Sequence, residues 1–389
     1  MKKKLWIIIS SIVALSIVLV FNYNNHTNSE SKPVQFNSTI NVDHYNEVKT
    51  FETSIKLNAI GDLIIHEAVY QDAETSTGYD FDPMFQDIKY YLRNADITIA
   101  NQETILGGDE LDFSSYPTFN TPQVLANTLK NSGIDILSMA NNHTLDRGEA
   151  GVMSATQYLN EIELDYVGAY QSENDRNKHR VIHRKGIAVG FLSYTYGTNG
   201  VAVPEGKDYL VNLIDEDQIL KDLEELKPKT DFIVVNMHFG QEYQSLPSEE
   251  QIHLSELLAN NGADVILGHH PHILQPVDWI SKGQGKESFV AYSLGNFLSA
   301  QIDRDRSIGA IMQIQLTKEI DENQEINLDV SDAKIMPTYN QYENFKNFKI
   351  TPLVEVSEQH LSDAKHWFKQ KKDHIQSFTK RVEVVPYLE

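Results

Sequence analysis

Histidine, carboxylate and amide side chains gather in six short segments of the chain, each directly after an apolar run. Carboxylates bridge and neutralise divalent cations, amide oxygens complete a coordination shell, and imidazoles suit Zn, Mn or Fe. Two such ions about 3.5–4 Å apart can clamp the attacking and leaving oxygens of a displacement reaction. The residue types therefore predict a centre for two divalent metal ions. The segments contain, in order, Asp62 and His66; Asn101 and Glu103; Asn141, Asn142, His143 and Asp146; His238 and Glu242; His269, His270 and His272; and Asn296.

Each segment taken singly has an ordinary structural explanation. Asp62 after a glycine is typical of a turn, and Asp146 could cap a helix that starts near Glu149. Three histidines within the four positions 269–272 have little structural rationale beside a buried strand end. The sequence has no phosphate-binding Gly-x-x-x-x-Gly-Lys loop, dinucleotide fingerprint or Gly-x-Ser-x-Gly elbow at a suitable strand end. The joint pattern favours a metal site over these other chemistries.

An alternation of strands and helices must position these side chains. Strands spaced by helices indicate βαβ units, and in such sheets functional residues gather in loops at the carboxyl ends of the strands. The pattern predicts an α/β fold with all six segments at one edge. Strands are expected at 55–60, 96–100, 134–138, 164–168, 187–193, 231–237, 264–268, 288–294, 308–316 and 326–336, and helices near 83–94, 121–132, 149–161, 215–226, 248–261 and 358–381.

The composition argues against nucleic-acid binding and excludes cysteine-based chemistry. Lys and Arg number 33 and Asp and Glu number 55 among 389 residues, which gives a formal net charge of −22. Phosphate backbones are bound by basic surfaces, so a nucleic-acid partner is not expected. The chain has no cysteine, which rules out disulfides, a thiol nucleophile and Cys-based zinc sites.

The N-terminus predicts a membrane anchor. Lys2, Lys3 and Lys4 precede an uncharged apolar run at residues 5–21, which is long enough to span a bilayer with the lysines in the cytoplasm. A cleavable signal peptide would have a similar start, but no small-residue cleavage pattern follows. We therefore expect a single-pass protein of the cell membrane with its main domain extracellular.

The rest of the chain divides into three expected segments. Residues 22–54 are rich in Asn, Ser, Thr and Lys and predict a stalk or linker. Residues 55–340 are expected to form the main domain, and residues 341–389 a helical C-terminal extension.

The order of the polar motifs over residues 55–300 resembles the poly-γ-glutamate capsule synthesis family of CapA-type proteins, which is related to calcineurin-like metallophosphoesterases. The resemblance implies a four-layer α/β/β/α sandwich with the ligands on loops between the sheets. The motifs are Gly61-Asp62, Asn101-x-Glu103, Ala140-Asn141-Asn142-His143-x-x-Asp146-x-Gly148, His238-Phe239-Gly240-x-Glu242, His270-Pro271-His272 and Ser293-Leu294-Gly295-Asn296-Phe297.

The same resemblance assigns roles to the residues. Asp62 and His272 would hold one ion, Glu103 would bridge, and the other ion would be held by Asn142, His238 and His270. His143 would donate a proton or bind the anion, and Asp146 would orient it.

The sequence departs from the wider phosphoesterase pattern at two ligands. That pattern opens with Asp-x-His, whereas here Ile64 lies two residues after Asp62 and His66 lies four after it. The bridging position is normally an aspartate and here is Glu103. The further candidate ligands are His66, Asn101, Glu242 and His269.

Three functions are compatible with these residues. The first is a component of poly-γ-glutamate capsule synthesis or export, with the polymer and other capsule-synthesis subunits in the membrane as partners. The second is an extracellular metal-dependent phosphatase or phosphodiesterase. The third is a non-catalytic accessory that binds polymer and retains the site.

Overall fold

The computed structural model describes residues 50–283 and 285–389, and it confirms the mixed α/β class. These described residues belong to one compact unit. The expected anchor at residues 1–21 lies outside the described residues, as does the expected stalk up to residue 49. Within the described part of the chain, no helix has the length and apolar character needed to cross a membrane.

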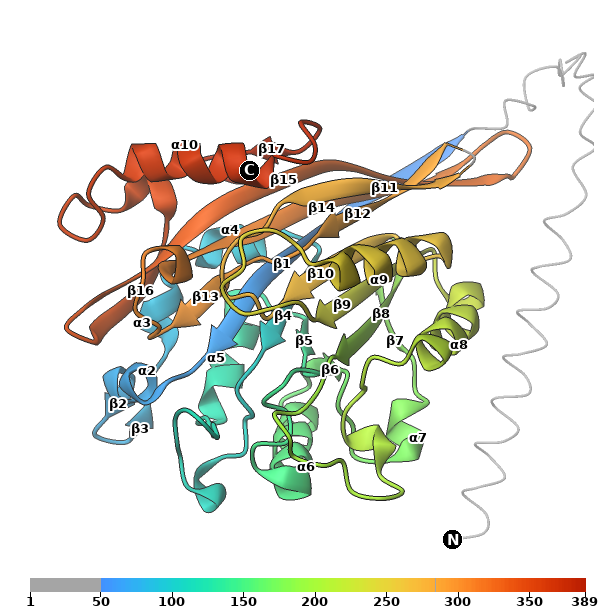
Figure 1. Ribbon diagram of the computed structural model, residues 1–389. Coiled ribbons are helices and arrows are strands. Elements are labelled where there is room, and N and C mark those ends of the chain that lie inside the picture. Colours follow the sequence, from blue (N-terminus) through green and yellow to red (C-terminus); the bar gives the residue numbers. More distant parts are fainter. Residues whose placement is uncertain (1–49, 284) are drawn as a thin grey trace, which may run out of the picture. The chain divides into compact units, whose positions relative to one another are not determined.

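A nine-stranded mixed sheet contains the first half of the polar segments (Figure 1). Strand β1 (Phe51–Ile64) lies at its centre, between parallel β4 (Ile97–Gln102) and antiparallel β14 (Ile308–Ile320). The parallel side continues with β5 and β6, so the carboxyl ends of four strands share one edge. The remaining strands are β5 (Ile136–Ser138), β6 (Asp165–Val167), β13 (Asn296–Ser299), β15 (Ile326–Glu343), β16 (Lys346–Pro352) and β17 (Glu383–Val384).

A second, six-stranded sheet contains the histidine-rich segments. Strands β8, β9, β10 and β12 are parallel, and antiparallel strands β7 and β11 form its two edges. In spatial order the strands are β11 (Val277–Gly283), β12 (Lys286–Ala291), β10 (Val265–His269), β9 (Phe232–His238), β8 (Ile187–Thr195) and β7 (Arg180–Arg184).

Four longer helices lie beside the two sheets. Helices α5 (Val124–Ser132) and α6 (Gly148–Glu161) lie beside the strands β4–β6, and α8 (Glu216–Leu226) and α9 (Glu249–Asn260) beside the second sheet (Figure 1). A fifth, α10 (Ala364–Ile375), lies near the C-terminus. The shorter elements are α2 (Glu67–Asp72), β2 (Glu74–Thr75), β3 (Gly78–Tyr79), α3 (Asp82–Phe85), α4 (Lys89–Arg93) and α7 (Glu173–Arg176), and the 3₁₀ turns η1 (Asp109–Leu111), η2 (Asp208–Leu210), η3 (Lys227–Lys229), η4 (Asp305–Ser307) and η5 (Leu353–Glu355).

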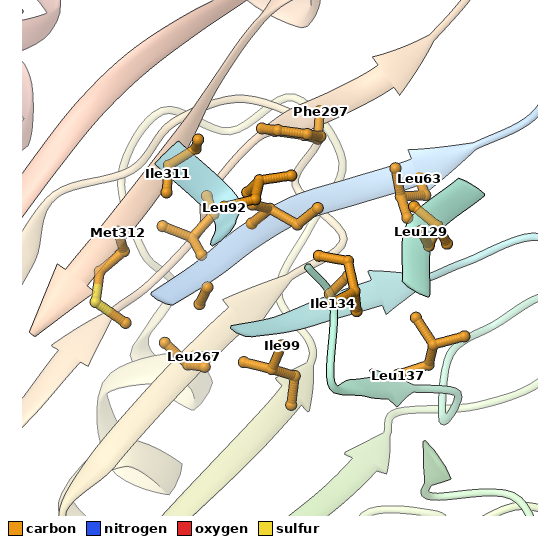
Figure 2. Close-up of a cluster of buried hydrophobic side chains, with 14 of the residues drawn as sticks. Leu63, Leu92, Ile99, Leu129, Ile134, Leu137, Leu267, Phe297, Ile311 and Met312 are labelled. Atoms are coloured by element: carbon orange, nitrogen blue, oxygen red, sulfur yellow. The ribbon is translucent and has the colours of Figure 1, made fainter. Parts of the chain in front are cut away.

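Alternation along the strands of the second sheet decides which side chains meet which layer. Successive side chains of a strand point to opposite faces. Val234 and Leu267 belong to the large core shared with the first sheet, whereas Val235 and Ile266 pack with residues of α8 and α9. Figure 2 shows part of the shared core. The two sheets therefore face each other, and helices cover the outer face of the second.

The expected elements of the main domain are present, with shifts at their ends. The expected helix at 83–94 is interrupted at residues 86–88 and forms α3 and α4. Strands β2, β3, β7, β11, β13, β16 and β17 were not predicted. Strand β1 begins at Phe51, inside the expected stalk, because residues 51–54 pair with residues 317–320 of β14.

The C-terminal segment is not a separate helical extension. The expected boundary at residue 340 lies inside β15, and β16 pairs antiparallel with that strand. Phe348 and Ile350 alternate toward the core and are buried, which gives the strand a reason to join the sheet. Helix α10 agrees with the helical pattern, but the segment as a whole belongs to the same compact unit.

Candidate metal centre

The predicted ligands come together where the carboxyl ends of both sheets meet. Asp62 lies near the end of β1 and Glu103 directly follows β4. His238 is the last residue of β9, and His269 the last of β10. Within each sheet these strands are parallel, so their carboxyl ends lie at the same edge of that sheet. Two sheets packed face to face thus bring together side chains more than 200 positions apart in the sequence.

One group of ligand atoms consists of Asp62, Glu103 and His272. The Asp62 Oδ2 atom lies 3.0 Å from His272 Nδ1, and Glu103 Oε1 lies 3.6 Å from His272 Nε2. All three side chains are buried. Asp62 and His272, the pair expected to hold the first ion, therefore lie next to Glu103, the expected bridging residue.

A second group consists of Glu103, His238 and His270. The His238 Nε2 atom lies 3.7 Å from Glu103 Oε1 and 2.9 Å from the amide oxygen of Asn142. The rings of His238 and His270 lie 4.9 Å apart. Glu103 is common to both groups, which is the position that a bridging carboxylate requires.

The spacing at Glu103 suits cations better than direct hydrogen bonds. Its Oε1 atom is fully buried and has no hydrogen-bond partner among the described residues. The nitrogens of His238 and His272 lie beyond hydrogen-bond distance of it, at 3.7 and 3.6 Å. Two ligands on one tetrahedral ion with bonds of about 2.0–2.2 Å are about 3.3–3.6 Å apart. The residues present therefore fit divalent metal ions.

A third group adds Glu242 to His270 and His272. Glu242 is exposed, unlike the other members. It is therefore at the solvent side of the centre, where it could complete a coordination shell or face a substrate.

Burial keeps two of the imidazoles in the form that binds metal. Desolvation, together with the neighbouring charge of His270, holds the pKa of His238 well below its usual range. Desolvation and His272 lower the pKa of His270 to about 3. A neutral imidazole has a free lone pair, so neither ring must lose a proton at neutral pH before it coordinates an ion.

The two carboxyl groups shift in opposite directions. Burial, with the charges of Asp62 and Glu242, raises the pKa of Glu103 well above its usual range. Burial alone would also raise the pKa of Asp62, but hydrogen bonds from His269 and His272 outweigh it and hold that pKa well below its usual range. A cation beside Glu103 would reverse its shift, because an adjacent positive charge favours the carboxylate.

Asn101 and His269 contact carboxylates of these ligand groups. The Asn101 amide donates to Asp62 Oδ1 at 2.8 Å and lies 3.5 Å from Glu103 Oε2. His269 Nδ1 lies 3.0 Å from the same Asp62 oxygen. His269 is absent from the three groups of ligand atoms, whereas His270 belongs to two of them. Of the two adjacent histidines, His270 thus lies in the ligand position and His269 supports Asp62.

His66 is not positioned as a substitute ligand. It belongs to none of the three groups among the described residues. Its Nδ1 atom lies 3.0 Å from the Ile64 carbonyl and accepts at 3.3 Å from the Ala300 amide. Burial lowers its pKa to about 4. Its ring instead contacts the backbone of Ile64 and Ala300.

His143 and Asp146 form a hydrogen-bonded pair beside the centre. His143 Nδ1 lies 2.7 Å from Asp146 Oδ2, which also accepts from the Phe119 amide at 2.6 Å. Asn141 does not face the centre: its side chain accepts from the His143 amide and donates to the Gln102 carbonyl. With Nδ1 engaged, Nε2 is the His143 nitrogen that can exchange a proton with a substrate.

Two glycines allow the strand ends to approach closely. A Cβ on Gly268 would lie 1.9 Å from the Tyr292 carbonyl oxygen, and one on Gly61 would lie 2.0 Å from that of Gly295. Each glycine directly precedes a residue of the centre, Asp62 or His269. A side chain at either position would push the ends of β1 and β10 away from the segment 292–295 that lies against both.

Two tyrosines beside the centre, and an arginine that lies over one of them, were not predicted from the sequence. The Tyr196 ring lies 4.7 Å from that of His270, the Tyr243 ring 6.0 Å from that of His272, and the guanidinium of Arg306 lies over Tyr243. Each sits in a loop or short turn without hydrophobic periodicity. No local signal in the sequence distinguishes them from other surface residues.

Comparison with known proteins identifies the family. The model of the bacterial capsule synthesis protein PGA_cap family matches residues 56–301, which include every residue of the three ligand groups. The chain belongs to this family.

Named relatives agree with that assignment. The capsule biosynthesis protein CapA of Bacillus anthracis is 30% identical over 259 residues, which cover 64% of this chain and 60% of that protein. The PGA biosynthesis protein CapA of Bacillus subtilis (strain 168) is 28% identical over 280 residues and 70% of each chain. The match to the first of these relatives thus spans less than two thirds of its length.

Among solved structures the likeness is looser. The NAD nucleotidase of Haemophilus influenzae superposes with a TM-score of 0.46 at 13% identity, over 87% of this chain and 58% of that one. A putative 5'-nucleotidase from Staphylococcus aureus gives a TM-score of 0.42 at 16% identity, over 82% and 58%. Nothing about the chemistry of this chain follows from overlaps of this size.

Proposed function

We propose that this chain is a membrane-anchored component of poly-γ-glutamate capsule synthesis or export, which acts outside the cell through a two-metal centre on a metallophosphoesterase-like sandwich. Membership of the capsule synthesis family supports the process. The names of the two Bacillus relatives support the polymer. The three lysines before the apolar run at residues 5–21 support the anchor and the outward orientation.

The observation that carries the metal centre is the shared, unpartnered oxygen of Glu103. This buried atom faces nitrogens of His238 and His272 at 3.7 and 3.6 Å. A buried polar atom without a partner costs about 1–3 kcal/mol. Cations between Glu103 and the two histidines would supply the missing partner and remove this cost.

The ligand residues divide between two ions. Asp62 and His272 would hold one, and Asn142, His238 and His270 the other, with Glu103 between them; Mn, Zn or Fe would suit this donor set. Bound ions would supply Lewis-acid activation of a carbonyl or phosphoryl oxygen and of water.

The chain's own proton donor lies beside these ligands. Asp146 holds His143 Nδ1 at 2.7 Å and so orients Nε2 toward the reacting group. His143 would give a proton to the leaving oxygen or nitrogen. No nucleotide-binding motif occurs in the sequence, so an ATP-driven ligation step belongs to partner subunits in this proposal.

A metal-dependent phosphodiesterase is the second candidate. The His143–Asp146 pair next to the ligand groups favours it, because general-acid help suits a phosphate ester with a poor leaving group. The difference from the first candidate is the bond that is attacked.

The test measures metal content and turnover on the same full-length, detergent-purified protein. We expect about two ions per chain in the wild type, as two-metal sites bind, and loss of metal in His238→Ala and His272→Ala. His253→Ala is a matched control, because His253 is exposed on α9 and, among the residues that the structure describes, forms an ion pair only with Glu216.

The outcomes separate the candidates. Metal with turnover of a phosphodiester supports the second candidate, and metal with cleavage or transfer of γ-linked glutamate supports the first. Wild-type metal content in both histidine variants would refute the centre. No metal after reconstitution would leave a non-catalytic, polymer-binding role.

A further inference from the structure

Arg306 lies beside the candidate centre without a carboxylate partner. Its guanidinium carbon is 3.7 Å from the centroid of the Tyr243 ring, and that ring is 6.0 Å from the His272 ring. Its neighbour in η4, Asp305, pairs with Lys371 at 2.6 Å. Within residues 50–283 and 285–389, no Asp or Glu oxygen is within ion-pair distance of Arg306. In a chain with a net charge of −22, this leaves a positive charge available on the tyrosine ring that neighbours His272.

Hydrogen bonds fix the backbone of Arg306 relative to the ligands. The Asn296 side chain donates to the Arg306 carbonyl at 2.9 Å. Asn296 is itself paired in register with Asp62, where β13 meets β1. Asn296, the residue of the last polar segment, therefore helps to position Arg306. It is not one of the expected metal ligands.

Tyr243 is fixed to the histidine loop in the same way. Its amide donates to the Pro271 carbonyl at 2.8 Å, between His270 and His272. Its φ is +65°, a left-handed conformation that is uncommon for a bulky residue and that often occurs at functional sites. The Tyr243 ring thus lies under the guanidinium on a backbone that is tied to the histidine loop, with 40% of the residue still exposed.

The surroundings of Arg180, which also stacks on a tyrosine, are different. Arg180 lies over Tyr166 at 5.0 Å, but it also pairs with Asp175 at 2.7 Å and donates to backbone carbonyls. Arg306 donates no side-chain hydrogen bond to any residue of the described part of the chain. A guanidinium has five N–H donors in a planar fork that matches carboxylate or phosphate oxygens. Those donors are free to bind a ligand.

We propose that Arg306, held flat by Tyr243, binds an oxyanion of the substrate on the His272 side of the centre and so determines specificity for anionic substrates. This inference rests on the proposed function, since it places the anion next to the reacting bond. A carboxylate of a glutamate polymer and a phosphate group offer the same chemistry to the guanidinium. Arg306 would also offset locally the repulsion between an acidic protein and an anionic polymer.

The test measures binding to the metal-loaded, full-length protein by calorimetry. The probes are a γ-linked glutamate oligomer with free α-carboxylates, the same oligomer with α-carboxamides, and inorganic phosphate. The variants are Arg306→Gln, which removes the charge, and Arg306→Lys, which keeps the charge without the fork. Arg304→Gln is the control, because Arg304 is exposed and lies over Trp367, 5.8 Å from its ring.

We expect Arg306→Gln to weaken binding of the carboxylate oligomer about tenfold or more, as for loss of a charged hydrogen-bond pair. The carboxamide oligomer should bind both proteins equally, Arg306→Lys should retain part of the affinity, and Arg304→Gln should match the wild type. A loss confined to inorganic phosphate would support the oxyanion site and assign it to a phosphate group. Unchanged binding of both anions, or an equal loss for the carboxamide oligomer, would overturn the role of Arg306.

Metal analysis of the same samples separates this failure from that of the proposed centre. A wild type without metal refutes the centre. A metal-loaded wild type whose anion binding does not depend on Arg306 refutes only the inference about Arg306.

Discussion

Replacing Glu103 by Gln should raise the stability of the metal-free protein and lower that of the metal-loaded one. Without metal, Glu103 is a buried carboxyl group whose Oε1 atom has no partner among the described residues. Burial and the charge of Asp62 raise its pKa, so its ionised form is unfavourable in the folded chain. A Gln amide carries no charge and can donate toward the neighbouring imidazole nitrogens, 3.6 and 3.7 Å from Oε1.

The size of both effects can be worked out. Relief of an unsatisfied buried group is worth about 1–3 kcal/mol, which corresponds to a rise in Tm of about 1–4 °C for a domain of this size. Two ions, each at about 100 times its Kd, stabilise the wild type by about 5.4 kcal/mol, twice the single-site value. Loss of the ligand shared by both ions should weaken each affinity about 100-fold or more, which leaves about 0.8 kcal/mol of that stabilisation in the variant. The loss of about 4.6 kcal/mol exceeds the gain of about 1–3 kcal/mol in the metal-free state.

The assay is thermal unfolding of both proteins with chelator and with added metal. The order of Tm values should invert between the two conditions, and Glu224→Gln, at an exposed position of α8, should match the wild type in both. A metal-free variant that is less stable than the wild type would refute the reasoning, because it would mean that the Glu103 carboxylate is satisfied by the protein alone.

The pH dependence of stability tests independently whether Glu103 destabilises the metal-free protein. The folded chain binds the Glu103 proton more tightly than the unfolded chain, since its folded pKa is raised. The carboxyl group therefore destabilises the metal-free fold increasingly as pH rises above about 4.3, the unfolded value. The advantage of the Gln variant should be smallest below that pH, grow as the pH rises, and level off above the raised pKa of the folded chain.

Two further predictions concern the proton donor and the strand ends. His143→Ala should lower turnover of a cleaved substrate about 10²–10⁴-fold at unchanged metal content; parallel loss of metal, measured by elemental analysis, would make His143 a ligand instead. Gly268→Ala should cost about 3 kcal/mol or prevent folding, because its Cβ would lie 1.9 Å from a backbone oxygen. Gly197→Ala, where no atom lies within 4 Å, is the control, and equal Tm values for the two variants would contradict the close approach.

Much of the fold was predictable because its strands are short apolar runs separated by amphipathic helices. Such runs gave the expected strands at β1, β4, β5, β6, β8, β9, β10 and β12 within a few residues. Their parallel pairing then places polar residues at one edge, whatever the details of packing. The C-terminal strands were harder, because β16 and β17 are stabilised by pairing with β15 and not by a local pattern.

The sequence by itself determined which residue types stand at the strand ends, and therefore that a metal centre is plausible there. Only the tertiary structure decided which of two adjacent histidines faces the ligands, since the chain leaves the strand at His270 with a φ of +95° and the alternation of faces no longer applies. It also decided that Tyr243 lies beside His272 and that Arg306 lies over Tyr243. Those contacts join segments far apart in the chain, and they arise from the packing of one sheet against the other, which local sequence patterns do not encode.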